Sequence, residues 1–337
     1  MPPKTSNVFP FIAGRGRRSG AAGAKIQLPA FVPPDLDLSH LDAATVITRN
    51  HKKIRVVCVG AGGSGSFVAY NVCRLAAVLE EAGREVEVVI VDPDRVSESN
   101  VPRSNFSESE IGMPKAQALQ IRFSRAWGVR VTAVNRKFHS SLLWQSDAGD
   151  CLTVIVGAVD NAAARRSINR AFTGTRSYEG RTPDTWWCDL GNDRETGQVL
   201  LGSATSIQQL RGSFALEGLC QSLPSPVMQS PDLLREIDEG PKLKKRLSCL
   251  ELMLMQEQSL MINQRMANEA GEMLAQLLLY RNLQRFATFV DTRLGVQTSE
   301  YTTPEHVARA VRRKRTDFLL DASAFDDDMD VMYEEAA

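Results

Sequence analysis

Short apolar runs and segments of helical periodicity alternate along much of the chain. The first run, residues 54–59, ends at a cluster of glycines and is followed by a stretch rich in Ala, Val and Leu. A run of this kind predicts a buried strand, and the stretch after it predicts a helix. We therefore expect an α/β fold. Further strands are expected at 86–91, 129–134, 152–159, 186–192 and 197–201, with a helix over 116–127.

A long connection follows these strands. Residues 203–247 are rich in Ser, Pro, Gly and charge without sustained periodicity, and a connection of this length usually has a function or is partly disordered. Ser248 and Glu251 then form a capping box, which predicts a helix from residue 249 to residue 281. A strand and a turn are expected over 286–295.

Both ends of the chain differ from its middle. The first 50 residues contain Pro, Gly and Ala with a basic cluster at 15–18, which predicts a partly disordered arm. Residues 304–320 predict a basic helix, and residues 326–335 predict a solvated acidic tail. We expect three parts: an N-terminal arm (1–50), a main domain (51–300, with its long loop at about 203–248), and a C-terminal helix with its tail (301–337).

Composition argues against several classes of protein. The 337 residues carry 40 basic and 40 acidic side chains, a formal net charge of zero, which argues against bulk electrostatic binding to nucleic acid or membrane. No apolar run approaches the roughly 20 residues needed to cross a bilayer, and no signal-peptide core is present, so a cytoplasmic location is expected. The six cysteines include no Cys-x-x-Cys pair, so we expect neither a zinc site nor a disulfide framework.

The glycine cluster after the first strand predicts a nucleotide site. Spaced glycines allow a tight turn, a close approach to phosphate and close packing of the helix, whose N-terminus offers unpaired N–H groups to an anion. The pattern fits nicotinamide, flavin and ATP binders alike, and it is also compatible with a simple tight turn. The glycines concerned are Gly60, Gly62, Gly63 and Gly65.

The second strand ends at Asp92, where an acid can hold a ribose hydroxyl. A dehydrogenase would continue into ordinary helix, but here a polar loop carries Asn100 and Arg103 and leads to Lys115. A lysine in the first turn of a helix opposes the helix dipole, which favours a phosphate contact over a surface position.

A second pair of polar residues, Asp160 and Asn161, follows the strand at 152–159. Either residue could simply cap the next helix. However, a carboxylate at the carboxyl end of a parallel strand, facing the glycine loop, lies where open α/β sheets bind ligands. Mg²⁺ prefers one or two carboxylates together with phosphate oxygens and water, an arrangement that Asp160 beside a bound phosphate would supply.

Cys249 is the candidate nucleophile. It lies in the first turn of a predicted helix after three cations, Lys244 to Arg246, and both features favour its thiolate. The alternative is that it packs as a small apolar residue. Cys220 is the second candidate, whereas Cys58 and Cys73 are expected in the core.

In this order, these segments resemble the ThiF/MoeB/ubiquitin-activating-enzyme superfamily: the glycine loop, Asp92-Pro-Asp94-Arg-Val, Asn100-Val-Pro-Arg103, Ile111-Gly-Met-Pro-Lys115-Ala, and Asp160-Asn161 followed by Arg165. A later combination resembles bacterial PRTRC-type ThiF proteins and bacterial ubiquitin-like conjugation systems: Ser248-Cys249, Gln258-Ser-Leu-Met-Ile-Asn263 and Phe289-Val-Asp-Thr-Arg293. The resemblance covers roughly residues 54 to 297. Pro102 and Ser104 depart from the polar residues that usually flank this arginine.

The resemblance implies a doubly wound, Rossmann-like, mainly parallel sheet with an added antiparallel half-sheet and a crossover loop. It also implies roles for single residues. Asp92 would hold the ribose, Asp94 would lie near the metal or nucleotide, and Asp160 would hold Mg²⁺. Asn100, Arg103 and Lys115 would contact the triphosphate of ATP, and Cys249 would form a thioester.

The implied reaction is ATP-dependent adenylation of the C-terminal carboxylate of a small ubiquitin-like protein, followed by transfer to Cys249. A homodimer is expected, and a conjugating enzyme is a possible further partner. Alternatives are an NAD- or FAD-dependent oxidoreductase, a non-catalytic nucleotide-binding adaptor, and an enzyme that adenylates a small molecule or a peptide terminus. The substrate, the source of any arginine finger and the fate of the thioester stay open.

Overall fold

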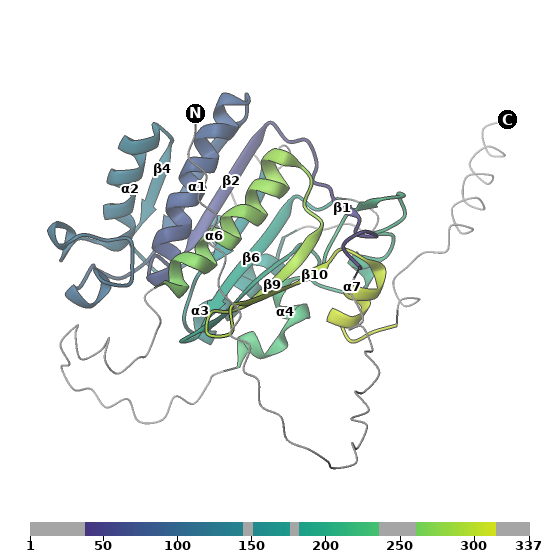
Figure 1. Cartoon of the computed structure of the whole chain (residues 1–337). Coiled ribbons are helices and arrows are strands. Elements are labelled where there is room, and N and C mark those ends of the chain that lie inside the picture. Colours follow the sequence, from purple (N-terminus) through teal and green to yellow (C-terminus); the bar gives the residue numbers. More distant parts are fainter. Residues whose placement is uncertain (1–37, 144–150, 176–181, 236–260, 315–337) are drawn as a thin grey trace, which may run out of the picture. The chain divides into compact units, whose positions relative to one another are not determined.

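A mixed sheet forms the centre of the computed structural model, which describes residues 38–143, 151–175, 182–235 and 261–314. Within them the eight strands of the sheet run in the order β10-β9-β7-β6-β5-β2-β3-β4 (Figure 1). The parallel strands are β2 (Lys53–Val59), β3 (Glu85–Val91), β4 (Val131–Val134), β5 (Cys151–Gly157) and β6 (Thr185–Asn192). The antiparallel strands are β7 (Thr196–Gly202), β9 (Arg285–Asp291) and β10 (Val296–Tyr301).

The parallel strands have the order of a doubly wound fold: from β2 the sheet is extended to β3 and β4 on one side, and the chain then crosses to β5 and β6 on the other side of β2. Val59 at the end of β2 pairs with Val91 of β3 and with Gly157 of β5. Open α/β sheets bind ligands outside the carboxyl ends of their strands at such a switch point. The predicted fold class is confirmed, including the added antiparallel strands.

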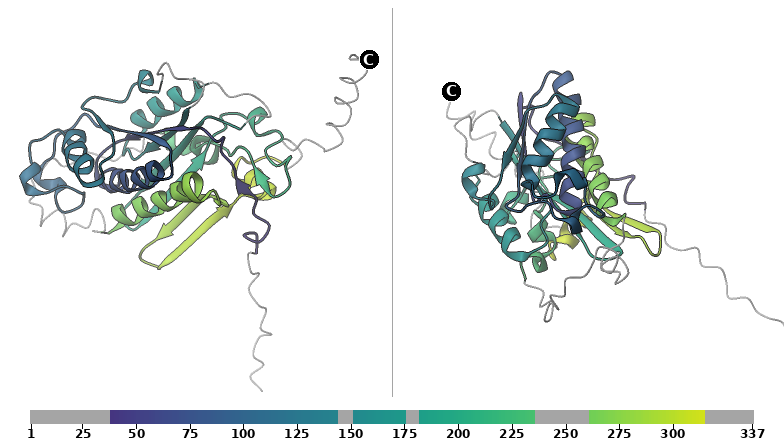
Figure 2. Two further views of the ribbon diagram at one scale, coloured as in Figure 1. Left: turned by 90° about the horizontal axis from the view of Figure 1, so that it is seen from above. Right: turned by 90° about the vertical axis from the view of Figure 1, so that its left-hand side faces the viewer.

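Helices cover both faces of the parallel strands. On one face α1 (Gly63–Glu81) lies between α2 (Lys115–Trp127) and α6 (Ile262–Ala275), as the views in Figure 2 show. Alternate strand residues such as Val56, Val88 and Val154 pack beneath them in the larger core. The other set, including Val57, Val89 and Ile155, packs against α3 (Ala162–Thr173) in a second core. Strands buried on both faces explain the continuous apolar runs in the sequence.

The described part of the predicted N-terminal arm (1–50) contacts the unit that contains the sheet. The unit that contains the sheet begins at Leu38, and Ala44 and Val46 are buried in the larger core. Strand β1 (Thr45–Val46) pairs in parallel with β8 (Leu219–Cys220), which belongs to the predicted long loop. The described part of that loop also contains α4 (Pro226–Gln229).

The C-terminal elements differ from expectation in two places. Strand β10 was not predicted; it forms a hairpin with β9 and extends the sheet. The predicted basic helix appears as α7 (Pro304–Ala310), and it ends well before residue 320 because Arg312 adopts a left-handed conformation. Val307 of α7 is buried in the larger core, so the described unit extends past residue 300.

The helix predicted over 249–281 is seen as α6 and a π-helical turn, Gln276–Tyr280. Its expected start at residue 249 lies outside the described residues. Among the helices that the structure describes, none is both long enough and apolar enough to span a membrane.

Candidate functional site

The glycine loop joins β2 to α1 in a conformation that only glycine fits well. Gly60 has φ of +91°, and a Cβ there would lie 2.5 Å from the carbonyl oxygen of Ala158. A Cβ on Gly65 would collide with the carbonyl oxygen of Gly60, whereas one on Gly62 would meet no atom within 4 Å. Gly60 and Gly65 thus allow the close packing of strand, turn and helix, and Gly62 faces open space.

The buried carboxylate of Asp92 supports the glycine loop through hydrogen bonds. Its Oδ2 accepts the backbone N–H of Ala61 at 2.6 Å, and its Oδ1 accepts that of Asp94 at 2.8 Å. Burial raises the pKa of the carboxyl, against the lowering effects of these two hydrogen bonds and of Lys115. The carboxylate therefore ties the end of β3 to the turn after β2, a structural role that the sequence did not reveal.

Lys115 and Asp94 form an ion pair beside the loop. The distance from Lys115 Nζ to Asp94 Oδ2 is 3.0 Å, and the Lys115 backbone N–H also donates to the Asp94 carbonyl. Lys115 is buried along its length, while the Asp94 carboxylate is largely exposed. The start of α2 is thereby fixed against the end of β3.

Asn100 and Arg103 occupy the polar loop between these elements. Asn100 is buried, and its Oδ1 accepts from the backbone N–H and the hydroxyl of Ser97, so it caps its own short turn. The Arg103 side chain is exposed and makes no hydrogen bond or ion pair with the described residues. Its carbonyl oxygen accepts from Asn263 Nδ2 at 3.1 Å. The structure fixes the backbone of Arg103 and leaves its guanidinium in solvent.

Asp160 and Asn161 follow β5, the strand beside β2. Asn161 caps α3, since its Oδ1 accepts the backbone N–H of Ala164 at 2.8 Å. Its Nδ2 donates to Asp160 Oδ1 at 3.0 Å, and the Asp160 carboxylate is exposed. Asn161 therefore caps the helix that follows, as was considered for either residue, while Asp160 presents its carboxylate to solvent at the carboxyl end of the sheet.

The predicted residues therefore form two groups at this edge. Asp92, Asp94 and Lys115 are joined to one another and to the glycine loop through hydrogen bonds. Asp160 lies at the end of the adjacent strand, and no contact joins its side chain to the first group within the described residues. Both groups lie at the switch point where a ligand is expected.

Sequence reasoning missed a polar network that supports the loop. Ser64 Oγ lies 2.8 Å from Asn192 Oδ1 and 3.1 Å from Asn263 Oδ1. Asn192 Nδ2 also donates to Asn263 Oδ1 at 3.1 Å, and a Cβ on Gly63 would collide with the Asn263 amide. Asn263 is buried. It connects α6 with the first turn of α1, the end of β6 and the Arg103 backbone.

Asp189 is a second residue that was missed. It is fully buried on β6, where its Oδ2 accepts from Arg165 Nε at 3.1 Å, and Arg165 also donates to the Leu190 carbonyl. Burial raises the pKa of Asp189 to about 6, although Arg165 lowers it. A Cβ on Gly157 would lie 2.9 Å from Asp189 Oδ1. This pair fixes the first turns of α3, and with them the position of Asp160.

Four of the described cysteines are buried and Cys151 is half-buried, whereas Cys249 lies outside the described residues. Burial raises the pKa of Cys220 to about 12, and its Sγ donates to the Ser222 carbonyl. Cys58 and Cys73 are buried, as predicted. In the ranges that the structure describes, no group of three or more His, Cys, Asp or Glu side chains could hold a metal ion.

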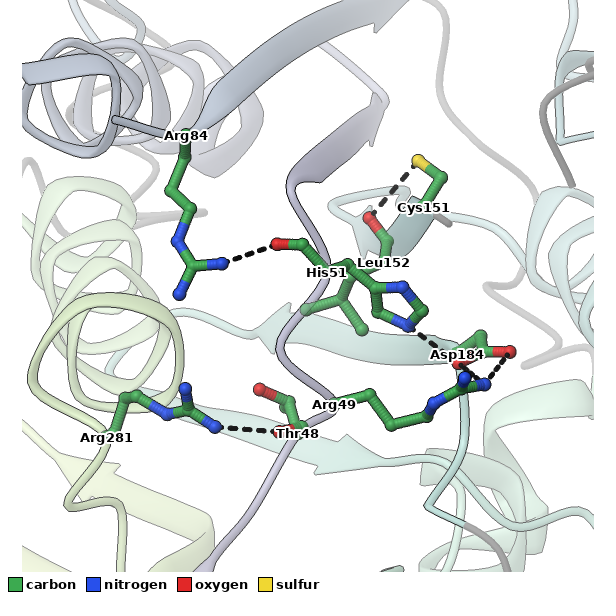
Figure 3. Close-up of polar contacts among 8 residues, drawn as sticks. All are labelled: Thr48, Arg49, His51, Arg84, Cys151, Leu152, Asp184 and Arg281. Carbon is green, nitrogen blue, oxygen red and sulfur yellow. Dashed lines mark hydrogen bonds and ion pairs between the residues drawn. The ribbon is translucent and has the colours of Figure 1, made fainter. Parts of the chain in front are cut away.

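A polar cluster lies at the opposite edge of the sheet, before the strands begin (Figure 3). Asp184 accepts from Arg49 NH1 at 3.0 Å and lies 2.7 Å from His51 Nε2, while Arg84 donates to the His51 carbonyl. Burial raises the pKa of Cys151 nearby. These contacts join the segments that enter β2, β3 and β6, and they are remote from the glycine loop.

A model of the ThiF family matches residues 39–178, which include the glycine loop, Asp92, Lys115 and Asp160. These residues form a ThiF-family domain. The domain thus covers both groups of predicted site residues, whereas Asp189 and Asn263 lie beyond it in sequence.

No curated protein sequence matches the chain. Similar solved structures include PaaA, at 12% identity and a TM-score of 0.44 over 74% of this chain and 64% of that chain. E. coli MccB with AMPCPP and MccA is 12% identical with a TM-score of 0.45 (75% and 64% covered). E. coli MccB with ATP is 11% identical with a TM-score of 0.44 (78% and 65% covered). The matched part of this chain thus covers less than two thirds of the length of each of these three solved chains.

Proposed function

We propose that this protein is an adenylyltransferase that uses ATP to activate the C-terminal carboxylate of a small ubiquitin-like protein and then takes the acyl group onto Cys249. The observation that carries the proposal is the cluster of Asp92, Asp94 and Lys115 at the glycine loop of a ThiF-family domain. It lies beside a strand end that presents the exposed carboxylate of Asp160. A homodimer and a conjugating enzyme are further expectations from the family resemblance.

The first turn of α1 and Lys115 would hold the phosphates. The N–H groups of a first helical turn have no partner within the helix and favour an anion. An ammonium group has three donors, and the Asp94 contact uses one of them. Lys115 could therefore bind phosphate oxygens while it stays paired with Asp94. The exposed Arg103 guanidinium would add a second, mobile cation.

Asp160 would hold magnesium that arrives with ATP. Its exposed carboxylate offers one oxygen bonded to Asn161 and one without a partner among the described residues. A single carboxylate fits a Mg²⁺ ion whose other ligands are phosphate oxygens and water, and it does not make an all-protein metal site. Such an ion would supply positive charge to the phosphate groups when bound.

The two chemical steps are balanced displacements. A substrate carboxylate oxygen attacks the α-phosphorus of ATP, the bond to the bridging oxygen breaks, and pyrophosphate leaves. The Cys249 thiolate then attacks the carbonyl carbon of the mixed anhydride, and AMP leaves as a thioester forms. Cys220 suits the second step poorly because its thiol is buried with a raised pKa.

The positions of the residues on either side of the segment that contains Cys249 are compatible with this cysteine reaching the candidate site. Before this segment, Leu234 accepts a hydrogen bond from Arg166 of α3 at 2.8 Å. After it, Met261 directly precedes α6 and the Asn263 network. The twelve residues from Cys249 to Met261 can extend up to about 40 Å, so the thiol could reach the carboxyl edge of the sheet.

The two steps can be separated by substitution. With candidate ubiquitin-like proteins, Asp160→Ala should abolish exchange of pyrophosphate into ATP, because the metal ligand is lost. Cys249→Ala should keep that exchange and lose a thiol-sensitive adduct. Cys151→Ala, a half-buried cysteine remote from the site, serves as the control and should keep both. If Cys249→Ala also lost exchange while folded, the proposed division of labour would be wrong.

A further inference from the structure

A groove on the antiparallel half of the sheet lies apart from the nucleotide site. It encloses about 290 Å³ and is lined by residues of β7, β9, β10 and the ends of α4 and α7. Its apolar lining residues are Leu200, Phe286, Ala287 and Phe289, of which the first three are buried, so the apolar side chain that the floor exposes is that of Phe289. Phe289 is 39% exposed, a large fraction for an aromatic side chain on a sheet face. The groove thus has the apolar floor of a site for a peptide side chain.

Arginines line one side of this groove. Arg309 pairs with Glu300 at 2.7 Å, and Arg312 lines the groove with a side chain that makes no hydrogen bond or ion pair to any described residue. The groove therefore offers apolar surface beside a cation that is free to bind a carboxylate.

The chain turns at Arg312, on the side of the groove that the arginines line. Arg312 has φ of +54°, and the N–H groups of Arg312 and Arg313 donate to the carbonyls of Arg309 and Ala308, which closes α7. A left-handed conformation in a non-glycine residue costs roughly 1 kcal/mol or more. The sequence after residue 310 contains neither glycine nor proline to stop the helix. The strained turn places Arg312 at the groove, and the last 23 residues of the sequence follow Lys314.

These last residues carry a pattern complementary to the groove. Residues 317–321 read Asp-Phe-Leu-Leu-Asp, an apolar triplet between two acids, and eight acidic residues but one basic residue lie between 315 and 337. From Arg312 to Phe318 is six residues, up to about 20 Å of extended chain. The triplet can therefore reach the floor while Asp317 or Asp321 meets Arg312.

We propose that residues 317–321 dock in cis in this groove, with the apolar triplet on Phe289 and a flanking carboxylate on Arg312. Docking would cover one face of β7, β9 and β10. Another protein could use that face only after the segment leaves. The surface is thus occupied by the chain's own C-terminal segment, and a partner peptide with the same acid-flanked apolar pattern would compete for it.

Limited chymotrypsin digestion of the full chain tests the proposal, with mass spectrometry to time cleavage after Phe318, Leu319 and Leu320. If residues 317–321 are docked in about nine-tenths of the molecules, a variant that releases them should be cleaved about tenfold faster at these three sites. The reason is that the cleavage rate is proportional to the fraction of molecules in which the segment is undocked. Phe289→Ser and Arg312→Glu should each accelerate it. Leu294→Ser and Arg293→Glu are the matched controls, since both residues are exposed and lie outside the groove. Cleavage after Tyr333 is the internal reference.

A double variant separates docking from a general loosening of the sheet. Replacing both Asp317 and Asp321 by asparagine should accelerate cleavage in the same way, and Phe289→Ser should then add little, because coupled changes are not additive. Equal rates in the wild type, Phe289→Ser and Arg312→Glu would overturn the proposal. Protection that grows with protein concentration would assign the groove to a second copy and would overturn docking in cis.

Discussion

Asp189→Asn should change how the stability of this protein depends on pH. The carboxyl is fully buried, and burial raises its pKa from 3.8 to about 6 despite the nearby Arg165. Between these two values the folded protein keeps a proton that the unfolded chain has released. The free energy of unfolding therefore falls as pH rises through this window and levels off above it. At about 1.36 kcal/mol per pH unit, a shift of about 2 units corresponds to roughly 3 kcal/mol.

Urea unfolding at pH values from 4.5 to 7.5 measures this contribution. About 2 kcal/mol of it falls within that range, since the unfolded chain begins to release its proton near pH 4. The free energy of the wild type minus that of Asp189→Asn should therefore decrease by about 2 kcal/mol from the lowest pH to the highest. Asp193→Asn, at an exposed position just past the end of β6, is the control and should run parallel to the wild type. Parallel curves for Asp189→Asn and the wild type would refute a raised pKa at this site.

Two further predictions concern the loop and its support. Gly65→Ala should lower stability by about 1–3 kcal/mol, because the new methyl group collides with the Gly60 carbonyl. Gly62→Ala meets no neighbour and should keep the melting temperature while it weakens ATP binding; the reverse pattern would contradict the geometry. Asn263→Leu should cost about 2–3 kcal/mol by unfolding in urea, since it leaves buried polar partners unpaired. The exposed neighbour Gln264→Ala should cost less than about 0.5 kcal/mol, and equal losses would exclude the network.

The parallel core could be predicted because each of its strands is buried on both faces and therefore reads as an apolar run. The elements that were missed lack that signal. Strand β10 has the sequence Val-Gln-Thr-Ser-Glu-Tyr, which is largely polar because it lies at the edge of the sheet with exposed side chains. The end of α7 at Arg312 was missed because the left-handed turn is made without glycine.

The residues of the candidate site also differ in how clearly the sequence identifies them. Motif residues such as Asp92 and Lys115 could be found because their neighbours in sequence identify them. Asp189 and Asn263 meet partners 24 and 160 positions away, Arg165 and Arg103, and no local motif reports such contacts. A weaker signal was present for both. Asp189 is an acid within an apolar run, and Asn263 lies three and four residues before the buried Met266 and Ala267, on the apolar face of its helix.

Burial decides which substitutions can test the chemistry. Asp92 was predicted to hold a ribose, but both of its oxygens also hold backbone N–H groups of the loop. Its replacement would disturb the fold and the nucleotide site together, so a loss of activity there would not identify a ribose ligand. Asp160 and Arg103 present exposed side chains that support no other described element. Activity lost at these two positions, with stability unchanged, would therefore test their proposed contacts with ATP and Mg²⁺ directly.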